Sequence, residues 1–291
     1  MDRPSLPPPP AARRFERLSR VVLTDEVSRT LFAEFAAHRA TDRGAEETGW
    51  VLLGRREDDH AVVLATLPAA TDRDASEGHV WITGPSHVLA SRIVRQRDRR
   101  LTMLGVVHTH PGRLRHPSRG DLTGDKVWVR QLRGQCGAFG IGTVTDPTAA
   151  GVPVADHPAP GVQTLGGLRF DWYTLAADDR TYQPVPVELT IGPDLAAGLR
   201  PVWPVIEEYA DRLDRLARQF ADVRFEPTDG PALAVTVGLT EPGESVRMVL
   251  EGKTTRYYYT AGGEVYQPDL PAGVAPDQGI YLLLAELAAR G

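Results

Sequence analysis

The feature that most constrains this chain is an apolar run that leads directly into two closely spaced histidines. Residues 101–107 (LTMLGVV) have the length and character of a buried β-strand, with Gly105 as their only turn-forming residue. Side chains alternate between the two faces of a strand, so His108 and His110 are predicted to point to one side and Thr109 to the other. Two imidazoles on one face at the end of a strand can share one cation.

The residues that follow predict a helix that carries a carboxylate. Pro111 and Gly112 end the strand, and Ser118, which follows a proline, is typical of a helix N-terminus. Asp121 falls on the first turn, from which its carboxylate can turn back toward the histidines. Ser118 and Asp121 also fit a Ser-x-x-Asp capping box, which needs no chemistry; both roles are compatible, because the cap orients the side chains. Two histidines, one carboxylate and an open fourth position are typical of a catalytic zinc site.

The spacing of these residues resembles a known signature. The pattern His-x-His, seven residues, Ser, two residues, Asp at His108, His110, Ser118 and Asp121 is similar to that of the JAMM (MPN-plus, JAB) zinc metalloprotease family. The resemblance covers roughly residues 15–150. It implies a mixed β-sheet flanked by helices.

The family also has an upstream glutamate in a pattern like Glu-x-x-Gly-x-Leu-Leu-Gly. Residues 46–54 (EETGWVLLG) resemble that pattern, with one additional residue before the Leu-Leu-Gly. Counting back three residues from Gly49 selects Glu46, and Glu47 is the alternative.

The resemblance implies a zinc peptidase mechanism. His108, His110 and Asp121 would hold one zinc ion per chain, which lowers the pKa of a bound water toward about 7. Glu46 would act as general base, and Ser118 would donate a hydrogen bond to the oxyanion or to that water. The implied reaction is cleavage of an isopeptide or peptide bond after the C-terminus of a ubiquitin-like protein, in maturation or deconjugation.

The expected partners follow from the same resemblance. Abundant Arg, Ala, Asp and Pro with few Lys suggest a GC-rich bacterial source. The substrate would then be a bacterial ubiquitin-like protein or its conjugates, and the cognate activating (E1-like) and conjugating (E2-like) enzymes would be further partners. The modifier tail is expected to lie beside an edge strand near the zinc.

Three alternatives of different kinds stay open. The first is processing of a sulfur-carrier ubiquitin-like protein in cysteine or cofactor biosynthesis. The second is a DNA-linked relative, since the RadC family has a similar His-x-His…Ser-x-x-Asp spacing; the Leu-Leu-Gly stretch and the lack of a helix-hairpin-helix module argue against it. The third is a non-catalytic MPN scaffold, which the complete set of expected ligands disfavours.

The apolar periodicity predicts an α/β (α+β) chain with three regions. Residues 1–12 contain a four-proline run and are expected to be a disordered tail. Residues 13–190 are assigned to the JAMM/MPN domain, with strands alternating with helices. In the whole chain, helices are predicted at about 24–39, 84–97, 118–134, 206–220 and 277–290, and the predicted strands include 79–83 and 182–190, with a loop at 146–167. Residues 191–291 are predicted to form a smaller α+β domain of unknown role with the order helix, four-strand meander, helix. That order is similar to the RWD and E2-like folds, although the region has no cysteine for E2 chemistry.

Composition excludes several classes of protein. The net charge of −5 gives no reason to expect nucleic acid as the main partner. The single cysteine, Cys136, excludes an intramolecular disulfide and suits a reducing cytoplasm. No apolar run has membrane-spanning length and no signal-peptide core is present, so the chain is expected to be cytoplasmic with no membrane partner.

One further motif is a run of five arginines within residues 92–100. A solvated helix end is the ordinary interpretation, because cations favour the C-terminal end of a helix. Docking of an acidic partner surface is the alternative.

Overall fold

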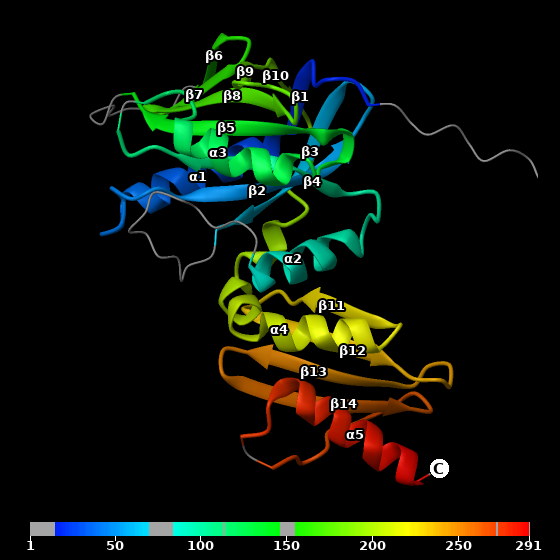
Figure 1. Cartoon of the computed structure of the whole chain (residues 1–291). Coiled ribbons are helices and arrows are strands. Elements are labelled where there is room, and N and C mark those ends of the chain that lie inside the picture. Colours follow the sequence, from blue (N-terminus) through cyan, green and yellow to red (C-terminus); the bar gives the residue numbers. More distant parts are fainter. Residues whose placement is uncertain (1–14, 70–83, 113, 146–154, 272, 291) are drawn as a thin grey trace, which may run out of the picture.

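The structure is a computed structural model that describes residues 15–69, 84–112, 114–145, 155–271 and 273–290. The predicted tail at 1–12 and a predicted strand at 79–83 lie outside the described residues. Two parts lie one above the other, each built on its own sheet (Figure 1). None of the helices in the described ranges is long and apolar enough to cross a membrane.

The N-terminal part is built on a mixed sheet with the strand order β10-β1-β3-β2-β4-β5-β8-β7-β6, and β9 pairs with β8. The strands are β1 (Arg20–Thr24), β2 (Gly49–Arg56), β3 (His60–Pro68), β4 (Thr102–Thr109), β5 (Cys136–Val144), β6 (Ala155–Ala159), β7 (Val162–Leu165), β8 (Leu168–Ala176), β9 (Gln183–Pro184) and β10 (Val187–Thr190). β1 runs parallel to β3 and β10, and β4 runs parallel to β5; the other pairs are antiparallel. The predicted mixed sheet is confirmed.

Helices cover both faces of this sheet. α1 (Asp25–Arg39) packs on one face, while α2 (Pro85–Arg95) and α3 (Arg119–Val129) pack on the other. Strand β2 shows why the sheet is buried on both sides: Trp50 and Leu52 face α1, whereas Val51 and Leu53 face α2. The predicted helix around Asp121 was placed too long, since α3 ends at Val129 and a 3-10 turn follows.

The C-terminal part is an antiparallel meander with two helices on one face. Its strands run in order from β11 (Val223–Pro227) through β12 (Ala232–Gly238), β13 (Ser245–Glu251) and β14 (Thr254–Ala261) to β15 (Glu264–Tyr266). α4 (Trp203–Gln219) precedes the sheet and α5 (Pro276–Arg290) follows it, and both contribute to the same core. The prediction of four strands was wrong by one, because β11 is short and ends in a proline.

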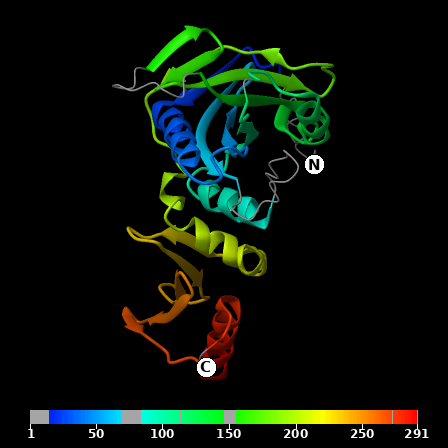
Figure 2. The ribbon, with the colours of Figure 1, turned by 90° about the vertical axis from the view of Figure 1, so that its left-hand side faces the viewer.

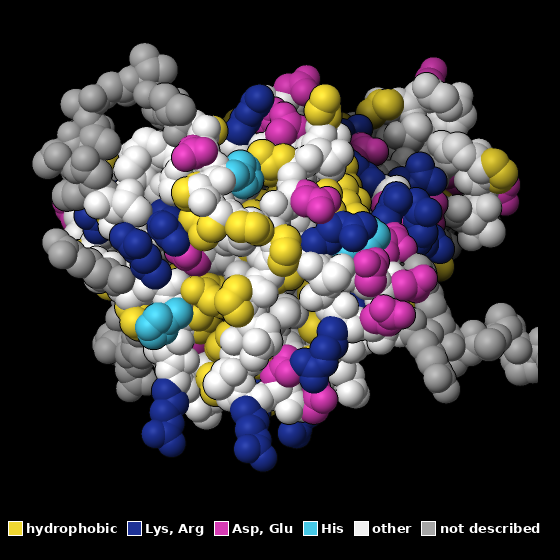
Figure 3. All heavy atoms as spheres, turned by 90° about the horizontal axis from the view of Figure 1, so that it is seen from above, with side chains coloured by type: hydrophobic (Ala, Val, Ile, Leu, Met, Phe, Trp, Pro, Cys, Tyr) yellow, Lys and Arg dark blue, Asp and Glu magenta, His cyan; other side chains and the backbone are white. Residues whose placement is uncertain are grey.

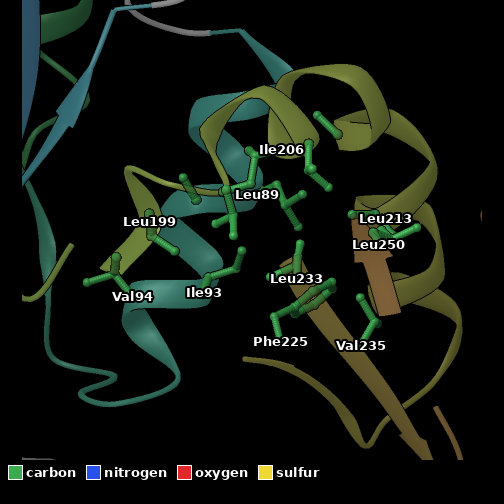
Figure 4. Close-up of a cluster of buried hydrophobic side chains, with 14 of the residues drawn as sticks. Leu89, Ile93, Val94, Leu199, Ile206, Leu213, Phe225, Leu233, Val235 and Leu250 are labelled. Carbon is green, nitrogen blue, oxygen red and sulfur yellow. The ribbon is translucent and has the colours of Figure 1, made fainter. Parts of the chain in front are cut away.

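The two parts share a hydrophobic core at their junction. α2 packs on α4, and the two helices lie between the sheets (Figure 1, Figure 2). The buried side chains that meet there include Leu89, Ile93, Val94, Leu199, Ile206, Leu213, Phe225, Leu233, Val235 and Leu250 (Figure 4). Burial of each large apolar side chain contributes about 1.5–3 kcal/mol, so the junction is part of the fold and not a loose linker.

Polar contacts fix the same junction. Arg92 on α2 donates from Nε and Nη2 to Oδ1 of Asp214 on α4, at 3.2 and 3.0 Å. The amide of Gln96, at the end of α2, bonds the backbone of β11: its Nε2 donates to the Val223 carbonyl at 3.2 Å, and its Oε1 accepts from Phe225 N at 3.1 Å. β11 is the edge of its sheet, so Gln96 occupies backbone groups that would otherwise be open to another strand.

Candidate metal centre

Strand β4 delivers two histidine side chains from the middle of the sheet. His108 lies opposite Gly49 of β2, and His110 N donates to the Gly142 carbonyl of β5 at 2.8 Å. Between them, Thr109 N donates to the Thr48 carbonyl at 2.8 Å, and Thr109 Oγ1 accepts from Thr48 N at 2.9 Å. Because the strand is bonded from both sides, the two imidazoles project from rigid backbone.

Three donor atoms converge on one point. The two Nε2 atoms of His108 and His110 are 3.1 Å apart, and Oδ2 of Asp121 lies 3.6 Å from the first and 3.5 Å from the second. The side chains are only 9%, 6% and 13% exposed, respectively. The three residues predicted as metal ligands are therefore brought together, and they form a group that can hold a metal ion.

The start of α3 orients the carboxylate. Ser118 is the N-cap, its Oγ accepts from Asp121 N at 3.2 Å, and Asp121 Oδ2 accepts from Ser118 N at 2.5 Å. This is the predicted capping box, and the same Oδ2 faces both histidines. The cap and the cluster thus use one carboxylate in one orientation.

A backbone carbonyl fixes the tautomer of His110. Its Nδ1 lies 2.8 Å from the carbonyl oxygen of Leu114, which can only accept, so Nδ1 carries the hydrogen in the neutral ring. Nε2 is then left with a lone pair that points into the cluster. This arrangement is the one that a metal-binding histidine requires.

The electrostatics of the cluster favour a positive charge at its centre. Burial opposes protonation of His110, but hydrogen bonds with Asp121 and Leu114 and the charges of Asp121 and Glu47 outweigh it, so the pKa of His110 is raised. Burial likewise works against ionisation of Asp121, yet hydrogen bonds and charge from His108 and His110 hold the pKa of Asp121 far below its usual range. Asp121 is therefore ionised at neutral pH.

These residues fit a zinc ion. Zinc–ligand bonds of about 2.0–2.2 Å at tetrahedral angles separate neighbouring ligand atoms by about 3.3–3.6 Å. The observed separations are 3.1, 3.5 and 3.6 Å. The lone pair of His110 Nε2 and the ionised Asp121 carboxylate face His108 Nε2, and imidazole nitrogen with carboxylate oxygen is a donor set that suits zinc. Three protein ligands leave one position open, as in catalytic zinc sites.

The two neighbouring glutamates have different surroundings. Glu46 accepts from Arg43 Nε at 2.7 Å, and its carbonyl lies 3.1 Å from His38 Nε2, so both groups of Glu46 are tied to the turn after α1. The charge of Glu47, by contrast, acts on His110. The β2–β4 register explains this difference: Gly49 opposes His108, and two residues further along Glu47 comes opposite His110, on the same face.

One half-buried group beside the cluster was not predicted from the sequence. Asp125, one turn after Asp121 on α3, accepts from Trp128 Nε1 at 3.0 Å and from the Tyr182 hydroxyl. Burial raises the pKa of Asp125 to about 6, and the charge of His108 opposes that rise. Its place on α3, four residues after Asp121, is the signal that could have identified it, and its bonds anchor α3 over the sheet.

Fold and site together define a JAB/MPN-type domain: a curled mixed sheet flanked by helices, with a His-His-Asp cluster at the end of an inner strand. The family model described as prokaryotic homologs of the JAB domain matches residues 28–152, which include the cluster. Residues 28–152 are therefore similar to prokaryotic JAB homologs, and the resemblance found in the sequence is confirmed.

Two other comparisons complete the picture. No curated protein matches the chain. Among solved structures, the solution structure of protein DSY2949 from Desulfitobacterium hafniense is similar with 17% identity and a TM-score of 0.39, over 60% of this chain and 95% of that one.

Proposed function

We propose that this protein is a zinc-dependent hydrolase that cleaves the peptide or isopeptide bond after the C-terminus of a ubiquitin-like protein. The observation that carries the proposal is the convergence of His108 Nε2, His110 Nε2 and Asp121 Oδ2 at 3.1–3.6 Å, buried at the end of an inner strand. The match to prokaryotic JAB homologs supports the reaction class. A bacterial modifier or its conjugates, with cognate activating and conjugating enzymes, is the proposed setting.

His108, His110 and Asp121 would hold the metal. When bound, zinc supplies the Lewis acidity that makes water nucleophilic near neutral pH. Glu47 takes the proton of the attacking water at its carboxylate and returns it to the leaving amine, because its charge acts on His110 and the register of Gly49 with His108 brings it opposite His110. This assignment replaces the first choice from motif spacing, Glu46, with its neighbour.

Ser118 contributes through its hydroxyl hydrogen. Its oxygen already accepts from Asp121 N, so the hydrogen is available for donation toward the substrate carbonyl oxygen. Donation to developing negative charge in a buried site stabilises the transition state more than the substrate.

The test is a reporter assay with purified full chain. The probes are two fusions, one with a bacterial ubiquitin-like modifier and one with a sulfur-carrier protein, each followed by a fluorescent reporter. Release of the reporter is expected to require zinc and to fall by about 10²–10⁴-fold in Glu47→Gln. Glu46→Gln, the matched control one residue away, should retain most of the activity.

The outcomes separate the parts of the proposal. Equal loss in both variants would refute the assignment of Glu47, and unchanged release in both would refute the general-base mechanism. A zinc-loaded wild-type protein that cleaves neither fusion would leave the non-catalytic scaffold as the better interpretation. Cleavage of the sulfur carrier alone would favour the biosynthetic alternative.

A further inference from the structure

A groove runs along the junction between the two parts of the chain. It has a volume of about 1000 Å³, with a floor from β2 and β4, one wall from α2, and the opposite wall from β11 and the residues before it. The lining residues that carry the argument are His87, Val88, Arg95, Arg99, Met103 and Arg224. A volume of this size lies at the upper end of ligand pockets and accommodates a short segment of polypeptide.

The charge of the groove is opposite to that of the molecule. Four arginines line it against two carboxylates, Asp222 and Glu226, whereas the whole chain has a net charge of −5. Arg95 and Arg99 are exposed and form no ion pair with any other residue that the structure describes. On the end of the molecule away from the C-terminal part, by contrast, cationic and anionic side chains are mixed (Figure 3).

The groove also offers a neutral ring and an apolar contact. His87 is only 4% exposed; its Nε2 donates to the Pro68 carbonyl at 2.9 Å, and its Nδ1 has no partner among the described groups. Since burial lowers the pKa of His87, the ring is neutral and adds no charge to the groove beside the arginines. Val88 is 47% exposed in the same groove and provides an apolar contact.

The walls are held in place before anything binds. The α2–α4 core, the Arg92–Asp214 pair and the amide of Gln96 on β11 join one wall to the other. Because the groove is already formed, binding of a ligand costs little free energy for ordering the groove walls.

We propose that this groove binds an acidic, extended segment of a partner protein. The arginines would pair with its carboxylates, and Val88 and Met103 would contact its apolar side chains. Nucleic acid fits less well, because no Phe, Tyr or Trp among the described residues lines the groove for base stacking, and the overall charge is negative.

The groove and the metal centre lie on the same face of the sheet. Val51 on the groove floor pairs with Val106 of β4, two residues before His108, and both valines and His108 point to the side covered by α2 and α3. A partner docked in the groove would therefore be held beside the cluster. We identify this partner with the substrate of the metal centre, and that identification rests on the proposed function.

Binding can be tested without catalysis. The full chain, freed of metal with a chelator, is used to select from a display library of random peptides of about eight residues, a length that spans about 26 Å when extended. The selected sequences are expected to be enriched in Asp and Glu. A labelled synthetic copy should bind about tenfold more weakly, or worse, to the double variant R95E/R99E, and more weakly at higher salt.

The matched control is R130E/R180E, which makes the same change of charge at two exposed arginines outside the groove and should bind like wild type. Circular dichroism confirms that both variants are folded. Selection without acidic enrichment, or equal loss in both double variants, would overturn the proposal. A single-stranded oligonucleotide that binds more tightly and competes with the peptide would also overturn it, in favour of nucleic acid. Because the measurement uses metal-free protein, failure of the hydrolase proposal leaves its result unaffected.

Discussion

The two ring nitrogens of His110 have separate roles. Nδ1 is committed to the Leu114 carbonyl, and this bond leaves Nε2 free to face His108 and Asp121. The sequence predicted that the two imidazoles share a face, because strand alternation is a local property. It did not predict the Leu114 bond, which depends on how the loop after the strand returns over the ring.

Removal of either imidazole should greatly lower the affinity of the site for zinc. Loss of a residue that only supports a ligand commonly costs 10–100-fold in metal affinity, so His108→Ala or His110→Ala is expected to lower zinc affinity by at least about 100-fold. The measurement is competition with a fluorescent zinc chelator at neutral pH. His116→Ala, at an exposed loop position nearby, should bind zinc like wild type; if it fails equally, the three-residue site is wrong.

His87 makes the junction sensitive to acid. Burial lowers the pKa of His87 in the folded chain, while the charge of Glu207 works in the opposite direction. Between the pKa of His87 in the folded chain and about pH 6.5, the imidazole is protonated in the unfolded chain but not in the folded one. The free energy of unfolding is therefore at its full value above about pH 6.5 and decreases as the pH falls through this range. The free energy of unfolding should therefore decrease more in wild type than in His87→Gln between about pH 7 and about pH 5, measured by urea denaturation. Parallel curves would contradict this role.

At the scale of elements, helix α3 and strands β2 and β4 determine the site. The Ser118 cap and the strand carrying the histidines follow from local signals, and both were predicted. Motif spacing alone does not decide between Glu46 and Glu47 as general base, because the position of each carboxylate depends on the register of β2 against β4, which begins at Gly49 and is set by long-range packing.

The missed elements are short strands that tertiary pairing creates. The predicted loop at 146–167 contains the β6–β7 hairpin in its described part, and a single predicted strand at 182–190 is divided into β9 and β10. Strands of two to five residues have too little alternation to be recognised alone. The longer helices α1, α2, α4 and α5 were predicted within a few residues of their ends, because their apolar periodicity extends over three or more turns.

The cap of α3 should link stability to metal binding. Ser118→Ala removes a bond to Asp121 N and is expected to cost about 0.5–2 kcal/mol of stability and to weaken zinc binding, because the Asp121 carboxylate is held less firmly. Thr24→Ala is the matched control: Thr24 caps α1 by accepting from Val27 N at 3.3 Å, away from the cluster. It should lose similar stability in thermal denaturation but bind zinc like wild type. Equal zinc affinity in the two variants would show that the cap is only structural.

At the scale of the whole molecule, the two sheets are one folding unit. The segment between them is bonded to the first sheet, since Asp194 accepts from Thr66 Oγ1 at 2.6 Å and Arg200 Nε donates to Glu34 at 2.7 Å. With the shared α2–α4 core, this makes independent motion of the two parts unfavourable. The apolar periodicity of the sequence predicted two domains but could not reveal that they share a core.

A substitution in that core should destabilise both parts together. Leu89→Ala, at a fully buried position of α2, is expected to cost about 2–5 kcal/mol, and Ile191→Ala, at a position 96% exposed, less than about 0.5 kcal/mol. Hydrogen exchange followed by mass spectrometry should show faster exchange in peptides from both sheets of Leu89→Ala. Faster exchange confined to the N-terminal sheet would contradict a shared unit.

The amide of Gln96 has a consequence for self-association. The side chain of Gln96 bonds Val223 O and Phe225 N of β11, the edge strand of the C-terminal sheet. These backbone groups are therefore not available to pair with a further strand. Gln96→Ala would uncover a template for cross-chain pairing at β11, so a protein that folds normally would acquire a route to fibrils or swapped dimers.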